Sequence, residues 1–204
     1  MILLGVVITV LTASLIAFFI INDRENKKEE DKPNEVVELD SIPNFKYVLE
    51  DRDTELYKET FEELRKVLIA DTIDYAEYAK LLTKLYIIDL YTIDNKMNQY
   101  DVGSLDFILE SAKESFDLKV KDTLYKYVED NSYGKRNQEL PIVSSIETEN
   151  AISETIKVGE ETYEGYTIEV TWNYEKDLGY DTKAKVSLAR IEDKLYIVNQ
   201  SALE

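Results

Sequence analysis

The chain has 204 residues, of which 24 are lysine or arginine and 42 are aspartate or glutamate, so its formal net charge at pH 7 is −18. Such a surface repels nucleic-acid phosphates, which argues against a nucleic-acid-binding function. The sequence has no histidine and no cysteine, which excludes zinc sites built on these ligands, cysteine nucleophiles and the Ser-His-Asp triad. Its 15 tyrosines, 6 phenylalanines and single tryptophan provide enough apolar bulk for a folded core.

Residues 2–21 (ILLGVVITVLTASLIAFFII) form one apolar run without charge or proline. About 20 apolar residues in a helix cover the roughly 30 Å hydrocarbon core of a bilayer. A cleaved secretory signal would instead show a basic start, a shorter apolar core and small residues before the cut. A buried core helix is the other alternative, but a helix apolar on all faces and followed by a charged segment argues against it. We therefore expect residues 1–21 to be a single-pass transmembrane anchor.

Lysine and arginine residues near the span bear on its orientation. Four of them follow the span within eleven residues and none precedes it, so the positive-inside rule places the C-terminal part in the cytoplasm. Acidic residues are mixed among these cations, and an absence of cysteine is common in exported proteins of Gram-positive bacteria. A short basic leader ahead of residue 1 would supply the lysine or arginine residues that usually precede a bacterial anchor. Against the positive-inside count, we expect a cell-membrane protein whose soluble part is extracytoplasmic.

The segment 22–44 is strongly charged and contains two of the three prolines of the chain. It has almost no large apolar residue before Val36, so it cannot bury enough surface to fold alone. We expect it to be a flexible stalk. Residues 45–204 are then one soluble domain, which opens with a short strand or an extended lead-in at 45–49.

The first half of this domain has the apolar period of helices. Thr54 can cap a first helix, and Asp74 with Glu77 three residues later can cap a second. A turn follows at 101–103. A third helical region is expected from Ser104 to about Glu129, with a possible break near its middle.

From Ile142 onward the apolar period changes to two, which is typical of half-buried antiparallel strands. One long or broken strand is expected over 142–158, with turns at 159–161 and 192–193 and a loop around Gly179. Three hairpin connections then give a curved four-stranded meander, and the three helices must cover one of its faces. The fold class is therefore α+β. The clearest alternation places these side chains on one face of a single strand: Tyr166, Ile168, Val170, Trp172 and Tyr174.

Three segments carry a resemblance to known proteins: 86–103 (YIIDLYTIDNKMNQYDVG), 122–141 (DTLYKYVEDNSYGKRNQELP) and 174–180 (YEKDLGY). They are similar to small membrane-anchored proteins of low-GC Gram-positive bacteria. The order of helices and strands, together with the Trp172 strand, resembles the nuclear transport factor 2-like (cystatin-like) cone. With the anchor and stalk, the architecture resembles the scaffold subunits of type IV secretion and conjugation machines. This fold hosts isomerases, dehydratases and binding modules, so the resemblance supplies no functional residues.

Asp89 is the carboxylate that we single out, because it follows Tyr86 on the apolar face of the second helix. In an isomerase of this fold, Asp89 and Tyr86 could share acid–base work, as in the ketosteroid isomerases. Asp89 could instead be a structural carboxylate bonded to a tyrosine hydroxyl, a lysine or a helix N-terminus. We favour the structural interpretation and expect no catalytic residue.

Motifs for cofactors and metals are also absent from the sequence. No GxxxxGK or GxGxxG phosphate loop occurs. The stretch 94–103 superficially resembles a calcium loop, but Lys96 occupies a ligand position and the glycine spacing is wrong. A scattered all-oxygen Ca²⁺ site on the acidic surface is the remaining metal alternative. We expect no cofactor and no metal.

These observations favour a membrane-anchored, non-enzymatic interaction or scaffold domain at the bacterial cell envelope, such as an accessory of a secretion or transfer machine. The expected partners are the membrane, through residues 2–21, and an envelope protein or a second copy of the chain. The alternative is a small-molecule-binding or isomerase-like cone that uses Asp89 and a tyrosine.

Overall fold

The computed structural model describes residues 33–203. The predicted anchor and the first part of the predicted stalk lie outside the described residues. Within the described range, no helix is both long and apolar enough to cross a bilayer. The described residues divide into two units, 33–35 with 131–135 and 36–130 with 136–203, and the larger unit carries the secondary structure.

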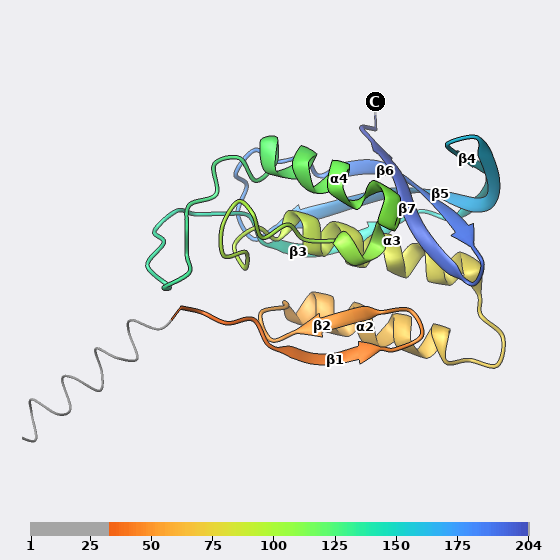
Figure 1. Ribbon diagram of the computed structural model, residues 1–204, viewed down its shortest axis with the longest axis horizontal. Coiled ribbons are helices and arrows are strands. Elements are labelled where there is room, and N and C mark those ends of the chain that lie inside the picture. The colour runs from red at the N-terminus through yellow and green to blue at the C-terminus, as the bar shows by residue number, and fades with distance from the viewer. Residues whose placement is uncertain (1–32, 204) are drawn as a thin grey trace, which may run out of the picture. The chain divides into compact units, whose positions relative to one another are not determined.

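The larger unit is an α+β domain with three α-helices and a mainly antiparallel sheet, which confirms the expected fold class (Figure 1). Thr54 caps the first helix by accepting a hydrogen bond from the Tyr57 amide, and Asp74 caps the second by accepting from the Ala76 and Glu77 amides. Both caps lie where the sequence predicts them. The elements in chain order are β1 (Glu38–Ile42), β2 (Tyr47–Glu50), α2 (Glu55–Leu68), α3 (Tyr75–Tyr91), the 3₁₀ turn η1 (Leu105–Phe107), α4 (Glu110–Asp122), β3 (Val143–Thr148), β4 (Ile152–Val158), β5 (Glu161–Tyr174), β6 (Lys183–Ile191) and β7 (Lys194–Ser201).

The main sheet has five strands instead of four, because the strand expected over 142–158 is broken into β3 and β4. Both pieces lie along the same side of the long strand β5: β4 pairs with its first half and β3 with its second half. β6 and β7 continue on the other side. The predicted hairpin turns are present, and Gly159 and Glu192 take the positive φ angles of 63° and 56° that such tight turns require.

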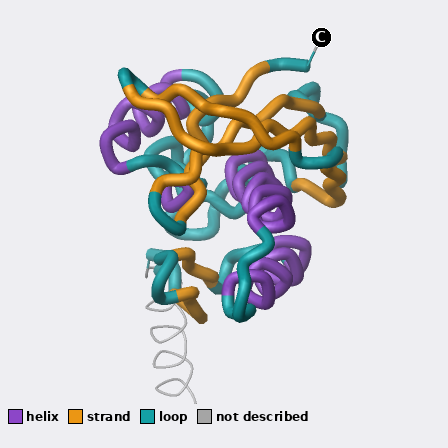
Figure 2. The backbone as a smooth tube through the Cα atoms, turned by 90° about the vertical axis from the view of Figure 1, so that its right-hand side faces the viewer, coloured by secondary structure: helices purple, strands orange, loops and turns teal. Residues whose placement is uncertain are grey.

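The core lies between one face of the sheet and α3. Ile168, Val170 and Trp172 of β5 are buried as the alternation predicts, and the Trp172 ring lies 4.9 Å from the ring of Tyr91 on α3. Figure 2 shows α3 against the sheet and α2 packed on the far side of α3. Because α3 is covered on two sides, most of its circumference is buried, and its side chains are apolar nearly all round.

Two boundaries differ from the sequence-based expectation. Residues 38–42, within the predicted stalk, form β1, which pairs antiparallel with β2 in a separate two-stranded sheet. The helix expected over 104–129 is reduced to η1 and α4, and α4 has no break. Ser104 is left-handed with φ 67°, and Ile108 is extended and bridges Ile197 of β7, so the backbone between 104 and 109 is used for tertiary pairing instead of a helix.

Candidate functional site

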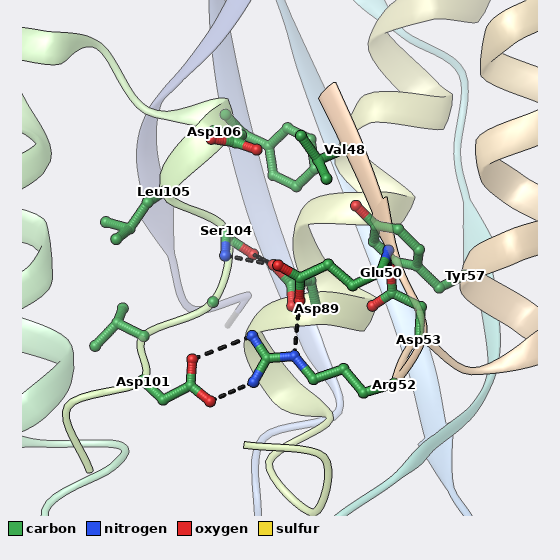
Figure 3. A pocket seen from close by; sticks show the side chains of 13 residues that line it. Val48, Glu50, Arg52, Asp53, Tyr57, Asp89, Asp101, Ser104, Leu105 and Asp106 are labelled. Carbon is green, nitrogen blue, oxygen red and sulfur yellow. Dashed lines mark hydrogen bonds and ion pairs between the residues drawn. The ribbon is translucent and has the colours of Figure 1, made fainter. Parts of the chain in front are cut away.

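An acidic pocket of about 250 Å³ lies where β2, the start of α2, α3 and the loop 101–107 meet (Figure 3). Five carboxyl groups line it, against a single guanidinium, that of Arg52. Apolar side chains complete its wall. The lining acids are Glu50, Asp53, Asp89, Asp101 and Asp106.

The connection between β2 and α2 fixes one side of the pocket. The Glu50 amide donates to Asp53 Oδ2 at 2.7 Å, and the Asp53 amide donates back to the Glu50 carbonyl at 3.2 Å. This reciprocal pair closes a tight turn directly before the helix cap Thr54. The first turn of α2 then places Tyr57 in the pocket wall.

Arg52 neutralises the opposite side of the pocket. Its guanidinium holds Asp101 through two hydrogen bonds, one of them from Nη2 to Oδ1 at 3.1 Å, while its Nε donates to Glu50 Oε2 at 2.7 Å. The dashed contacts in Figure 3 show Arg52 between these two acids. Burial alone would raise the pKa of Asp101, but the hydrogen bonds and charge of Arg52 hold it below its usual value. Asp101 and Arg52 are therefore a balanced ion pair.

Asp89, the acid predicted from the sequence, is fully engaged by internal partners. Its Oδ1 lies 2.5 Å from Nζ of Lys96, a lysine whose side chain is only 1 % exposed. Its Oδ2 accepts from the amide of Ser104 and, at 3.3 Å, from the Ser104 hydroxyl. Gly103 makes this approach possible, because a Cβ there would lie 2.9 Å from Asp89 Oδ1. The structural interpretation of Asp89, bonded to a lysine, describes this arrangement.

The structure does not bring Tyr86 to Asp89. The Tyr86 hydroxyl donates to Gln200 Oε1 at 2.8 Å, and the Gln200 amide donates to the Tyr91 hydroxyl at 2.7 Å. Burial raises the pKa of the Tyr86 hydroxyl well above its ordinary value. Tyr86 thus belongs to a buried hydrogen-bond network beneath β7, and it is not among the residues that line the pocket.

Among the buried lining residues, Asp53 and Tyr57 lack adequate internal partners; the carboxylate of Asp106 also has none, but Asp106 is exposed. Tyr57 is 5 % exposed, and within the described part of the chain its hydroxyl has no hydrogen-bond partner. Asp53 is 9 % exposed, and a single backbone amide serves its carboxylate. Burial, followed by the charge of Asp89, raises the pKa of Asp53 from the ordinary 3.8 to about 6, although the backbone hydrogen bond and Lys96 oppose the change. The folded chain thus holds a carboxylate there at a cost in stability.

Metal binding does not explain this cluster of acids. Among residues 33–203, no group of three or more acidic side chains is arranged to hold a metal ion. Arg52 and Lys96 occupy the positions around Asp101 and Asp89 where a cation would otherwise sit. What remains open is the side of the pocket formed by Glu50, Asp53 and Tyr57, whose free oxygen atoms can accept hydrogen bonds.

The raised pKa of Asp53 predicts a stabilising substitution, Asp53→Asn. The folded state holds the proton of Asp53 more tightly than the unfolded state does, so this side chain contributes stability below about pH 3.8 that is lost as the pH rises through about 6. Asparagine keeps the acceptor for the Glu50 amide and removes the charge. We expect the free energy of unfolding to increase by about 1–2 kcal/mol at pH 7, after allowance for solvent screening, and to change little at pH 4.

Urea unfolding followed by the fluorescence of Trp172, the one tryptophan of the chain, measures this difference. The matched control is Asp71→Asn, the same change at an exposed position, with an expected effect within about 0.5 kcal/mol at both pH values. A loss of stability in Asp53→Asn at pH 7 would contradict the prediction.

Sequence reasoning missed Asp53, Tyr57 and the role of Lys96. The available signal was the dense charge in 50–53, set between an apolar strand and a helix cap, with a tyrosine one turn into the helix. No family model, no curated protein and no solved structure matches the chain, so the site rests on its own geometry.

Proposed function

We propose that this chain is a membrane-anchored, non-enzymatic binding domain of the bacterial cell envelope, and that it recognises an envelope protein through the acidic pocket. Residues 2–21 would be the anchor, and the domain beyond them a nuclear transport factor 2-like cone. The resemblance to type IV secretion and conjugation scaffolds suggests an accessory of such a machine. In this proposal the acidic pocket is the surface that contacts the partner.

One observation carries the proposal: the pocket contains polar groups that the fold leaves without partners. Buried polar groups in folded domains nearly always have hydrogen-bond partners, because an unpaired one costs about 1–3 kcal/mol. The side chains of Tyr57 and Asp53 are mostly buried, and each keeps a free oxygen atom that is not among the fully enclosed unpaired atoms of the described residues. These oxygen atoms therefore open into the pocket, where solvent or a ligand must serve them. A partner that supplies donors and positive charge would satisfy both groups.

Site-specific photo-cross-linking of the full-length chain in bacterial membranes tests this role. A photoreactive residue at Leu105, in the pocket wall, is expected to give a discrete protein adduct, and Asp53→Asn and Tyr57→Phe should each reduce its yield at least threefold. The matched control is the same photoreactive residue at Thr171, an exposed position of β5, whose adducts should not respond to these substitutions. A Leu105 adduct that is absent, or unchanged in both variants, would contradict the proposal.

The proposed side of the membrane has its own test. The test adds protease to cells whose cytoplasmic membrane is intact and reachable from outside. If the domain is extracytoplasmic, the protease should digest it, while a cytoplasmic marker protein survives. Protection of the domain in intact cells, with digestion only after lysis, would place it inside as the positive-inside count indicates.

A second candidate function is an isomerase-like pocket, because Asp53 has a pKa near 6 and lies in the same pocket as the Tyr57 hydroxyl. A carboxyl group with that pKa can accept and return a proton at neutral pH. Asp53 would take the role first considered for Asp89, and Tyr57 that of Tyr86. The test is deuterium exchange at carbon in a panel of small ketones in D₂O. Exchange that the chain accelerates and Asp53→Asn abolishes would support it, and no Asp53-dependent exchange would reject it.

A further inference from the structure

We infer that the group bound in the acidic pocket is a primary alkylammonium, carried either by a free aliphatic amine or by a lysine side chain of the partner. This inference rests on the proposed use of the pocket as a binding site. It adds the chemical class of the ligand.

The charge of the pocket calls for a cation. Of its five carboxyl groups, Asp101 is paired with Arg52, Asp89 is paired with Lys96, and Glu50 shares Arg52 through one of its two oxygens. Asp106 has no ion pair within the described residues, but it is exposed to solvent. Asp53 has no cationic contact at all within the described residues, and the charge of Asp89 acts against its ionisation. A positive ligand next to Asp53 would remove this repulsion and stabilise the ionised carboxylate.

The hydrogen-bond acceptors match an ammonium group. An ammonium carries three N–H donors and no acceptor. On the Asp53 side of the pocket, one oxygen of Glu50, one oxygen of Asp53 and the hydroxyl of Tyr57 have no internal donor. Figure 3 shows Asp53 and Tyr57 on one side of the pocket, with the Glu50 side chain reaching from that side toward Ser104 and Arg52. One ammonium can thus serve these three acceptors, while the exposed carboxylate of Asp106 is left to solvent.

The rest of the wall matches an aliphatic stem. Val48, Leu105 and Phe107 line the pocket beside the acids, and Figure 3 shows Val48 and Leu105 away from Arg52. A lysine-like chain of four or five methylenes buries its stem on apolar surface while its charged end meets carboxylates. A volume of about 250 Å³ is suited to such a chain and not to a large ring system.

A guanidinium fits these acceptors less well. It presents its donors as a planar fork, which is best met by both oxygens of one carboxylate, as Asp101 meets Arg52. The Glu50 and Asp53 carboxylates each already use one oxygen internally, so neither offers a complete bidentate edge. We therefore expect discrimination between ammonium and guanidinium on the same stem.

The test is a calorimetric titration of the full-length chain at pH 7.5 with pentylamine, pentylguanidine and 1-pentanol. We expect pentylamine to bind at least tenfold more tightly than either of the others. Asp53→Asn should weaken pentylamine binding about tenfold and Tyr57→Phe about fivefold. Lowering the pH to 5 should weaken binding to the unmodified chain more than binding to Asp53→Asn. Glu50, Asp89 and Lys96 are the other charged groups that act on Asp53, and Asp106 is a further lining acid whose pKa is raised by burial; both proteins retain all four.

Two controls separate binding from folding and from total charge. Asp53→Asn is expected to stabilise the fold, so weaker binding would not reflect unfolding. Glu169→Gln removes one charge on the exposed face of β5, where Glu169 pairs with Lys185, and should leave pentylamine binding unchanged. Equal binding of pentylguanidine or 1-pentanol, or full affinity in Asp53→Asn, would overturn the inference.

A last pair of ligands distinguishes the two sources of the ammonium, namely 1,5-diaminopentane and a short peptide with one internal lysine. Binding of the peptide, abolished when that lysine is acetylated, supports recognition of a protein partner. Binding of the diamine alone keeps the ammonium inference and contradicts the proposed protein partner. If no amine binds while the Leu105 cross-link still depends on Asp53, the ligand class is wrong and the proposed function stands.

Discussion

Lys96→Met is expected to lower the free energy of unfolding by about 3 kcal/mol, because it leaves the largely buried Asp89 carboxylate, which is 17 % exposed, without its counter-charge. The Lys96 side chain is 1 % exposed and its Nζ lies 2.5 Å from Asp89 Oδ1. Methionine fills a similar volume, so the loss of stability comes from the missing charge more than from changed packing. The remaining donor to Asp89 is Ser104, and four further acids line the same pocket, namely Glu50, Asp53, Asp101 and Asp106.

Urea unfolding followed by Trp172 fluorescence measures the effect, and two further variants interpret it. Lys176→Met removes a lysine of an equally close ion pair, that of Lys176 with Glu139 at 2.5 Å, but with side chains 61 % and 68 % exposed. We expect it to cost less than about 0.5 kcal/mol. The double variant Asp89→Asn with Lys96→Met should be more stable than Lys96→Met alone, since the unpaired charge is gone. A Lys96→Met cost no greater than that of Lys176→Met would show that the buried pair does not stabilise the fold.

Local signals in the sequence predict much of the fold. The caps at Thr54 and Asp74 and the alternation of β5 depend on residues within a few positions of one another, and all are present. The hairpin at Gly159 is local in the same way. The third helix is present as α4 but begins later than expected for a non-local reason, since Ile108 pairs with Ile197, a residue nearly ninety positions away that no helical period can reveal.

The site depends almost wholly on such distant contacts. Asp53 lies next to Asp89, and Arg52 next to Asp101, only after the loop 101–107 has folded onto the turn before α2. Arg136 shows the same limit, because its buried side chain donates to the carbonyls of Lys96 and Asp94, some forty positions away. A sequence shows that charges are present. Tertiary structure decides which charged groups find partners. The pocket is identified by the few groups that find none.

The long strand β5 carries the second large prediction, Gly165→Ala. Gly165 is the buried position at which β5 has β4 on one side and β6 on the other. A Cβ there would overlap the carbonyl oxygen of Leu188 on β6 and would lie 2.6 Å from Cγ1 of Ile156 on β4. The close neighbour is backbone and cannot rotate away, so the paired strands must separate. We expect a loss of about 3 kcal/mol or more in the free energy of unfolding.

The matched control for this prediction is Gly159→Ala, a glycine with φ 63° in the β4–β5 turn whose Cβ would meet no atom within 4 Å. That change carries only the backbone cost of a left-handed alanine, about 1 kcal/mol. The two variants differ in whether the added methyl group meets the neighbouring strand. If Gly165→Ala costs no more than Gly159→Ala, β6 does not approach β5 as closely as described. We expect Gly165→Ala to cost more and to leave pentylamine binding unchanged in the folded fraction. That result would show that damage to the sheet does not alter the pocket, as expected for a binding site built on β2, α2 and the loop 101–107.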